Sequence, residues 1–229
     1  MTSPTLAQII NSPYITGPSI STTATYGAQT AEHTNVVLVA YSFPVTDPGV
    51  SVSDSNNGAY TLVPNSSITD PINLFRVCAF ARKRINAAGA GTNVVTATCG
   101  AATALYLEIL IGEVAGADLD DPIDVANADI GNDATPNSGP VTPHSASQLA
   151  IAYCSSVPDA TGPGAGWLSV DATGSPGGGE TNQGGWLEEQ NPAPAVPVSG
   201  TFTANAGPWG ALILTFQPPQ PNTVFANTD

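Results

Sequence analysis

Two glutamates and two histidines are the first places to look for acid–base chemistry in this 229-residue chain. Glu108 and Glu113 lie in one apolar run, and paired carboxylates can hydrolyse glycosidic bonds. They are five positions apart, so on a β-strand they would face opposite sides of the sheet unless a bulge intervenes. His33 and His144 are isolated from each other in the sequence, and no catalytic pair is evident around either. The sequence therefore predicts a protein that is not an enzyme.

Three cysteines could supply a nucleophile or a disulfide. Cys78, Cys99 and Cys154 lie in the apolar or small-residue stretches VCAF, TATCG and AIAYCSS. Their odd number and wide spacing argue against a disulfide framework. We expect buried free thiols that act as small hydrophobic side chains. One disulfide between two neighbouring strands is the open alternative.

An acidic run, ADLDDPIDVANADIGND (117–133), is the candidate metal site. Asp118, Asp120, Asp121 and Asp124 could supply oxygen ligands to Ca²⁺. The spacing is not that of an EF-hand loop, because Ile123 stands where the sharp-turn glycine is needed. The favoured interpretation is that these aspartates form turns and cap backbone amides. No other cofactor is expected.

All four positive charges fall within RVCAFARKR (76–84), whereas the formal net charge is −14 and the pI is about 4.1. That negative field repels nucleic acids and anionic membranes, so neither is expected as a partner. Alternation predicts a strand that is buried on both faces in its middle, with the cations at its end. Arg82 and Arg84 would then pair with the chain's own carboxylates or with an acidic patch on an adjacent subunit.

Short runs of β-branched and apolar residues, separated by turn residues, fill most of the chain and predict strands rather than helices. The charged fraction is only 10%, against a usual ~25%, which suits a protein that packs against copies or partners. We expect one antiparallel β-sandwich domain over residues 20–218. The expected strands are 19–27, 35–43, 50–54, 59–63, 74–82, 93–100, 104–114, 147–156, 166–170, 200–204 and 209–217.

The two ends and one Gly- and Pro-rich stretch lie outside this strand pattern. Residues 1–19 predict an extended N-terminal arm, in which Leu6, Ile9 and Ile10 contact the domain or a neighbouring subunit. Residues 219–229 form a Pro-rich tail. The stretch 157–199 predicts long loops that carry Trp167 and Trp186, as anchors of an interface or of loop packing, or as rings that stack on sugars. Trp209 begins an apolar strand and is expected in the core. The N-terminal sequence lacks the basic and apolar regions of a secretory signal.

Several of these stretches match a recurring sequence pattern. The chain resembles a jelly-roll β-sandwich module found in tailed-phage virion proteins and in bacterial surface proteins, over about residues 35–218. One departure is the turn NNGA, where the module has GN. The resemblance is carried by NVVLVAYS (35–42), VSDSNNGAYTLV (52–63), FRVCAFARKRINAAGAGTNVVTAT (75–98), LYLEILIGEVAGADLDDPID (105–124) and PWGALILTFQP (208–218).

The resemblance implies an all-β, single jelly-roll-like antiparallel β-sandwich that is used for assembly or adhesion, and it transfers no active site. The expected function is that of a virion structural protein of a tailed phage, as a capsid decoration (cement) or fibre protein. Such a protein would reside in the virion, form homo-oligomers, and contact the major capsid protein or other virion subunits. The alternative is a bacterial surface adhesin or carbohydrate-binding module that uses Trp167 or Trp186.

Overall fold

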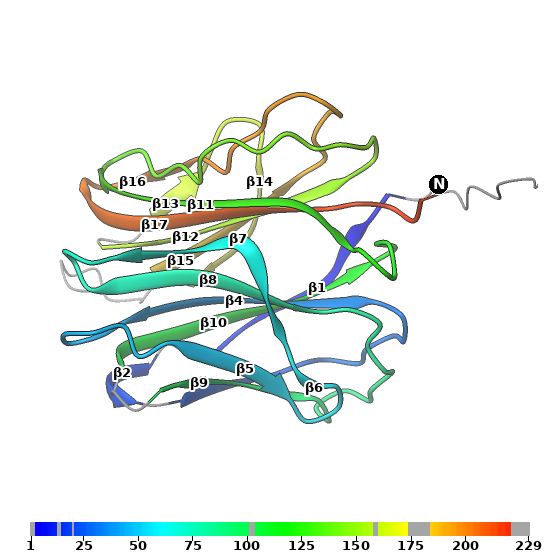
Figure 1. The fold of residues 1–229 in the computed structure, drawn as a ribbon, viewed down its shortest axis with the longest axis horizontal. Coiled ribbons are helices and arrows are strands. Elements are labelled where there is room, and N and C mark those ends of the chain that lie inside the picture. Colours follow the sequence, from blue (N-terminus) through cyan, green and yellow to red (C-terminus); the bar gives the residue numbers. More distant parts are fainter. Residues whose placement is uncertain are drawn as a thin grey trace, which may run out of the picture.

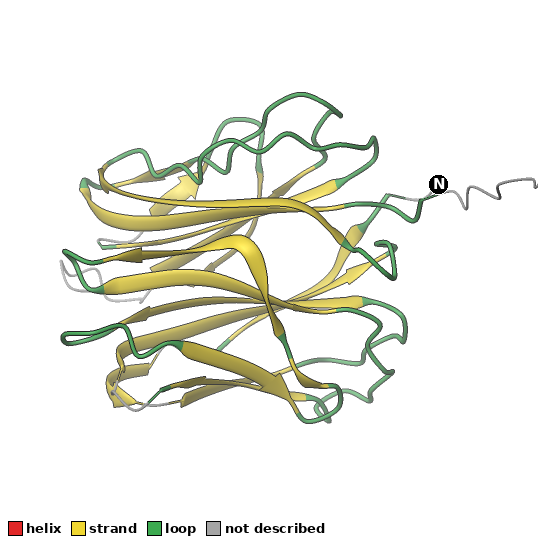
Figure 2. Ribbon diagram, viewed as in Figure 1, coloured by secondary structure: helices red, strands yellow, loops and turns green. Residues whose placement is uncertain are grey.

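The computed structural model describes residues 3–12, 15–19, 21–100, 104–157, 160–173 and 184–220. Every regular element in this part is a β-strand (Figure 2), and none of these residues belongs to a helix that could cross a membrane. The strands are β1 (Thr5–Asn11), β2 (Ile15–Ser19), β3 (Ser21–Thr25), β4 (Thr34–Ser42), β5 (Val50–Asp54), β6 (Gly58–Ala59), β7 (Thr61–Asp70), β8 (Phe75–Arg82), β9 (Val94–Cys99), β10 (Ala104–Ala115), β11 (Ile123–Asp133), β12 (Leu149–Ser156), β13 (Ala160–Pro163), β14 (Leu168–Thr173), β15 (Gly184–Gln190), β16 (Phe202–Ala204) and β17 (Gly207–Phe216).

The strands form antiparallel sheets that are stacked in layers (Figure 1). The central sheet has the order β1-β10-β4-β8-β7, and β2 also pairs with β10. An upper sheet, β11-β17-β12-β15-β14, covers one face, and a lower sheet, β3-β9-β5-β6, covers the other. The two-stranded β13-β16 sheet lies beyond the upper sheet (Figure 1). The expected all-β antiparallel sandwich is confirmed, and the third main layer is a feature that the sequence pattern did not indicate.

The central sheet is apolar on both faces. In β4, Val36 and Leu38 pack in the core that faces the upper sheet, whereas Val37 and Val39 pack in the core that faces the lower sheet. A strand that is covered on both sides has no solvent-facing positions, which explains its unbroken apolar run. β8 follows the same rule: Val77 and Ala79 face up while Cys78 and Phe80 face down, and this confirms that the middle of the basic stretch is buried on both faces.

A third apolar cluster lies on the outer face of the upper sheet. Trp209 and Ile213 of β17 contribute to it, together with Trp167 and Phe202 from outside that strand. Trp209 is only 5% exposed, so the expectation that it belongs to a core is confirmed. The glycine- and proline-rich loops therefore cover a real apolar surface.

The N-terminal segment is extended and pairs with the sandwich itself, which is one of the two alternatives expected for the arm of residues 1–19. β1 pairs with β10 along its length, with Ile9 opposite Gly112, and β2 pairs with the other end of β10. Gly112 makes room for this packing, because a Cβ there would lie 3.3 Å from Ile9 Cδ1 and 3.4 Å from Leu6 Cδ1. Leu6 and Ile9 pack against the upper core and Ile10 against the lower one. The open edge of the central sheet supplies the hydrogen-bonding partners that the sequence reasoning assigned in part to a neighbour.

Candidate functional site

The two glutamates that could have formed a catalytic pair lie on opposite faces of the central sheet, as parity predicted. Glu108 is fully buried and accepts a hydrogen bond from the Tyr106 hydroxyl. Glu113 is 2% exposed and faces the lower sheet, where His33 Nδ1 lies 2.6 Å from its carboxylate. The Gln8 side-chain amide also donates to Glu113, so this carboxylate ties β1 to the loop before β4. Sequence reasoning missed the His33–Glu113 pair because 80 residues separate the two.

The three cysteines are free and buried, which confirms the expectation of buried thiols. Burial raises the pKa of Cys78 to about 12 and that of Cys99 to about 11, although Arg76 acts in the opposite direction on Cys78. Burial also raises the pKa of Cys154. Each thiol therefore stays protonated and unreactive at neutral pH.

Glu188 on β15 is a buried carboxylate that the sequence did not single out. Its side chain is 0% exposed and accepts hydrogen bonds from the backbone N–H of Gly164 (3.0 Å) and Thr201 (3.1 Å). Burial raises its pKa to about 8, although those two hydrogen bonds act to lower it. Its contacts fix two loops to the upper sheet. Nothing in the sequence distinguishes it from its neighbour Glu189.

A buried polar network joins the central and lower sheets. Asn35 of β4 donates to the Tyr60 hydroxyl at 2.8 Å, and Tyr60 donates to Asp54 of β5 at 2.7 Å. Asn93 donates to Asp54 at 3.0 Å and to Gln29 at 2.7 Å, while Gln29 donates to Asn35 at 2.8 Å. All five side chains are buried. Buried polar groups are tolerated when they satisfy one another in this way.

Four members of this network come from the stretches that carry the family resemblance. Asn35 belongs to NVVLVAYS, Asp54 and Tyr60 to VSDSNNGAYTLV, and Asn93 to GTNVVTAT. Asp54 also accepts the backbone N–H of Asn56 and Asn57, which closes the turn between β5 and β6. These motif residues build the fold, which explains why the resemblance specifies an architecture and no chemistry.

The acidic run 117–133 forms turns and an edge strand. Asp118 accepts the backbone N–H of Asp120 and of Asp121, each at 2.9 Å, and Asp124 accepts the backbone N–H of His144 at 2.8 Å. These are the backbone caps that the favoured interpretation expected. Within the described ranges, no group of three or more His, Cys, Asp or Glu side chains could hold a metal. The four Ca²⁺ candidates are thus not gathered into a ligand set there.

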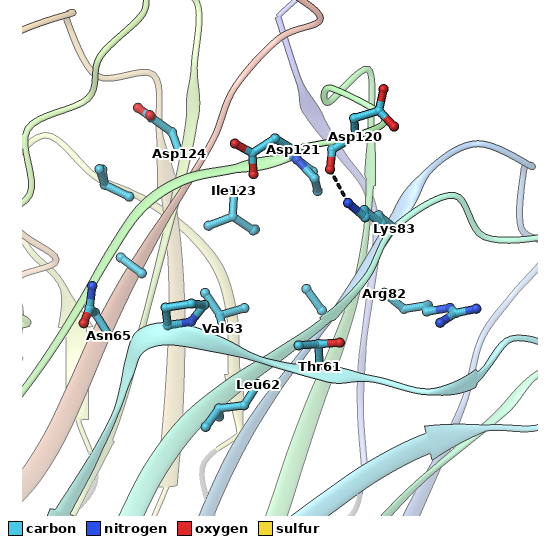
Figure 3. Close-up of a pocket in the computed structure, with 15 residues that line it drawn as sticks. Thr61, Leu62, Val63, Asn65, Arg82, Lys83, Asp120, Asp121, Ile123 and Asp124 are labelled. Atoms are coloured by element: carbon cyan, nitrogen blue, oxygen red, sulfur yellow. Dashed lines mark hydrogen bonds between the residues drawn. The ribbon is translucent and has the colours of Figure 1, made fainter.

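One open groove lies between the edge of the central sheet and the edge of the upper sheet. β7 is the edge strand below it and β11 the edge strand above it, and the cavity has a volume of about 560 Å³. Figure 3 shows Val63 and Ile123 extending towards each other across the space. The lining is completed by Thr61, Leu62, Pro64, Asn65, Ala81, Arg82, Lys83, Asp120, Asp121, Pro122, Asp124, Val125 and Ala126.

The groove exists because β7 leaves its partner strand. Leu62 pairs with Phe80 and Ser67 pairs with Cys78, so four residues of β7 lie opposite a single residue of β8. Asn65 within this bulge has a φ of +61°. Such bulges twist an edge strand away from regular pairing. The bulge here leaves apolar side chains of both sheets facing an open space.

Charged residues line one end of the groove. The Lys83 ammonium donates to the carbonyl oxygen of Asp120 (Figure 3), and Arg84 lies 2.8 Å from the Asp120 carboxylate and 3.5 Å from that of Glu32. Arg82 donates a long hydrogen bond of 3.5 Å to the carbonyl of Ala59. The cations thus pair within their own chain, and the predicted pairing of Arg82 and Arg84 with an adjacent subunit stays a prediction.

The two loop tryptophans occupy unlike positions. The Trp167 ring is 7% exposed and its indole N–H donates to the carbonyl of Ser199 at 3.1 Å. It packs a loop onto its own domain and offers little surface to a neighbour, which matches the loop-packing alternative. Trp186 lies on β15, opposite Cys154, and not in a loop as the sequence suggested. The Trp186 side chain lies outside the described part of the structure.

The comparisons with known proteins give little guidance. No protein-family model matches the chain, and no curated protein matches it. Among solved structures, the chain is similar to the crystal structure of the STIV MCP, a viral capsid protein, with 9% identity over 96% of this chain and 100% of that chain. The TM-score is 0.27, and a similarity at that level carries no argument about function.

Proposed function

We propose that this protein is a non-enzymatic virion structural protein of a tailed phage, as a capsid decoration or fibre protein. The observation that carries the proposal is the groove between β7 and β11, an open apolar surface with a charged end. An exposed apolar surface with a polar rim is typical of an interaction site. The glutamates and cysteines that could react lie in the interior, so the surface is suited to binding.

A second surface supports a role in assembly. Val45 is 77% exposed and Ile72 is 86% exposed, and they lie on the β4–β5 loop and the β7–β8 turn. Asp47 links the two segments, because it lies 3.1 Å from Arg76 and accepts a hydrogen bond from Thr69 at 3.2 Å. Loops that are held in place lose little entropy when they dock, so they can present apolar side chains to a neighbour.

The proposed partners are the major capsid protein, other virion subunits and further copies of this chain. Many copies on a symmetric shell turn weak individual contacts into stable attachment. Attachment would stabilise the shell by mass action, because the subunit binds the assembled form. The proposal includes neither a nucleic-acid ligand nor a resident cofactor.

One of the two tryptophans that could stack on sugars in the adhesin or carbohydrate-binding alternative is not available for that role. Trp167 is packed within its own domain, so it cannot present its face to a sugar without unpacking the loop. A glycan array with and without Ca²⁺ separates the two functions. Binding that disappears in a Trp186→Ala variant would support the adhesin and contradict the virion proposal.

Immunoelectron microscopy tests the virion role directly. Antibodies against the purified chain should label intact phage particles from the host that carries the gene at regular positions on the head or on a fibre. Particles that stay unlabelled, although the antibody recognises the purified chain, would overturn the proposal.

A variant pair tests the loop surface. Val45→Asp combined with Ile72→Asp should abolish attachment to particles and leave the fold unchanged by circular dichroism. Leu168→Asp is the matched control, because Leu168 is 66% exposed on β14, at the edge of the other sheet. Equal loss of attachment in both variants would contradict a specific role for the two loops.

A further inference from the structure

The chain leaves the described structure beside the wall of the groove. Phe216, the last residue of β17, pairs with Ile123, which lines the groove. Gln217 then donates its backbone N–H to the carbonyl of Pro122 at 3.0 Å and its side-chain amide to that of Asp121 at 2.7 Å. The Gln220 N–H lies 3.2 Å from the carboxylate of Asp118. Residues 217–220 are thus fixed against the segment that forms the upper wall.

The nine residues that follow Gln220 have a composition that suits the groove. Their sequence is PNTVFANTD (221–229), in which Val224 and Phe225 are the large apolar residues and Asp229 is the charged one. The groove has an apolar lining that includes Val63 and Ile123, and its charged lining residues are Arg82, Lys83, Asp120, Asp121 and Asp124. The apolar pair Val224 and Phe225 suits the apolar part of this lining.

We propose that residues 221–229 bind in the groove between β7 and β11 of the same chain, with Phe225 on the apolar lining. Phe225 lies five positions after Gln220, and an extended chain of that length reaches ~16–18 Å. The cavity of about 560 Å³ has room for the two apolar side chains. A docked segment covers this apolar surface in the free subunit, and a partner has to displace it in order to bind there.

Residues 221–229 are joined covalently to residues 217–220 beside the groove. This connection favours binding of the chain's own segment over binding of the same segment from a second copy. A short flexible linker gives its ligand an effective concentration on the order of 1 mM. A second copy at micromolar concentration competes poorly with it. The groove is the surface on which the proposed function rests, but the tests below use the purified chain alone, so their failure and a failure of virion attachment are separate outcomes.

Peptide binding tests the proposal first. A chain that ends at Gln220 should bind fluorescein-labelled PNTVFANTD in a fluorescence anisotropy titration. If the Kd is on the order of 0.1 mM, the full-length chain should bind the same peptide about tenfold more weakly, because its own segment competes. Equal binding by the two chains, or no binding by the shortened chain, would overturn the proposal.

Two substitutions make the peptide test specific. A Phe225→Ala peptide should bind at least about tenfold more weakly, since it loses the buried ring. Thr61→Asp in the shortened chain should have a similar effect, because Thr61 lines the groove on the same face of β7 as Val63 and is exposed, so the substitution is tolerated by the fold. Leu168→Asp is the matched control and should bind normally. An equal effect of the two Asp substitutions would contradict binding in the groove.

Cross-linking in the full-length chain gives a second readout that does not depend on truncation. Thr61→Cys combined with Phe225→Cys should form a disulfide within one chain under mild oxidation, and the buried native thiols should not compete. Leu168→Cys with Phe225→Cys is the control and should stay reduced. A disulfide-linked dimer would assign the groove to a second copy, and the absence of any cross-link would reject docking there; either result overturns the proposal.

Discussion

Asp54 and Asp118 form the same local structure in two very different places. Asp54 accepts the backbone N–H groups of the residues two and three positions later, and so does Asp118. Asp54 lies in the buried network between the central and lower sheets, where Tyr60 and Asn93 also donate to it. Asp118 lies beside the groove, where it also holds the N–H of Gln220. From this comparison we expect burial, and not the turn itself, to decide how much such an aspartate contributes to stability.

The largest expected effect comes from Asp54→Ala. The substitution leaves several buried donors without an acceptor, so the free energy of unfolding should fall by ~3–5 kcal/mol. Urea unfolding followed by circular dichroism measures it, with Asp118→Ala as the matched control. Equal losses of unfolding free energy in Asp54→Ala and Asp118→Ala would contradict the expectation that the buried aspartate contributes more.

Low pH should also destabilise the protein through Asp54. Burial raises the pKa of Asp54, but hydrogen bonds from Asn57, Asn93 and Tyr60 outweigh it, so the pKa in the folded protein lies below the ordinary 3.8. A carboxyl with a lowered pKa adds stability above its unfolded pKa and loses that stability as the pH falls through the folded value. Each pKa unit corresponds to about 1.4 kcal/mol.

The Asp54→Asn variant isolates this contribution. Its unfolding free energy should fall less steeply than that of the native chain between about pH 5 and about pH 2, because residue 54 no longer titrates. Urea titrations across that range provide the measurement. Parallel curves for the two proteins would show that Asp54 does not contribute to acid denaturation.

A smaller effect is expected from Asp118→Ala. The loss of a backbone cap at a half-exposed turn typically costs ~1 kcal/mol, and a melting temperature should fall by about 2–4 °C in a chain of this size. Differential scanning calorimetry measures the shift. A drop as large as that of Asp54→Ala would show that the groove rim is a part of the core.

Arg84→Ala should have the smallest effect. Its ion pairs with Asp120 and Glu32 are exposed, and exposed pairs contribute little. We expect no measurable change in the urea midpoint at physiological salt. A clear loss of stability that disappears in high salt would show that the ion pairs of Arg84 at the groove rim contribute to the free energy of unfolding.

The interior strands of the fold could be predicted from the sequence, because each covered strand is an apolar run. The expected strands 35–43 and 74–82 match β4 and β8 within one residue at each end. β11 was missed because it is an edge strand, so its sequence IDVANADIGND alternates weakly and its aspartates resemble turn formers. β1 was assigned to an arm because seven residues give little signal when their pairing partner lies about a hundred positions away.

The candidate site was less predictable than the fold. Arg82 was correctly placed at the end of β8, but the groove depends on how the edges of two sheets meet and on the bulge in β7. The polar network was missed for a related reason, since Asn35 and Asn93 are far apart in sequence and look like ordinary turn residues. Distances between strands that are remote in sequence are set by packing, which local patterns do not encode.

Two cores share the central sheet, and this affects how the protein unfolds. β4 and β10 contribute side chains to the cores on both sides, so neither outer sheet can detach without exposing apolar surface on the same strands. Amide protons in the middle of these strands should therefore exchange with solvent only when the whole chain unfolds, while those of β7 and β11 exchange through local fluctuations. The two cores should melt together in one cooperative transition.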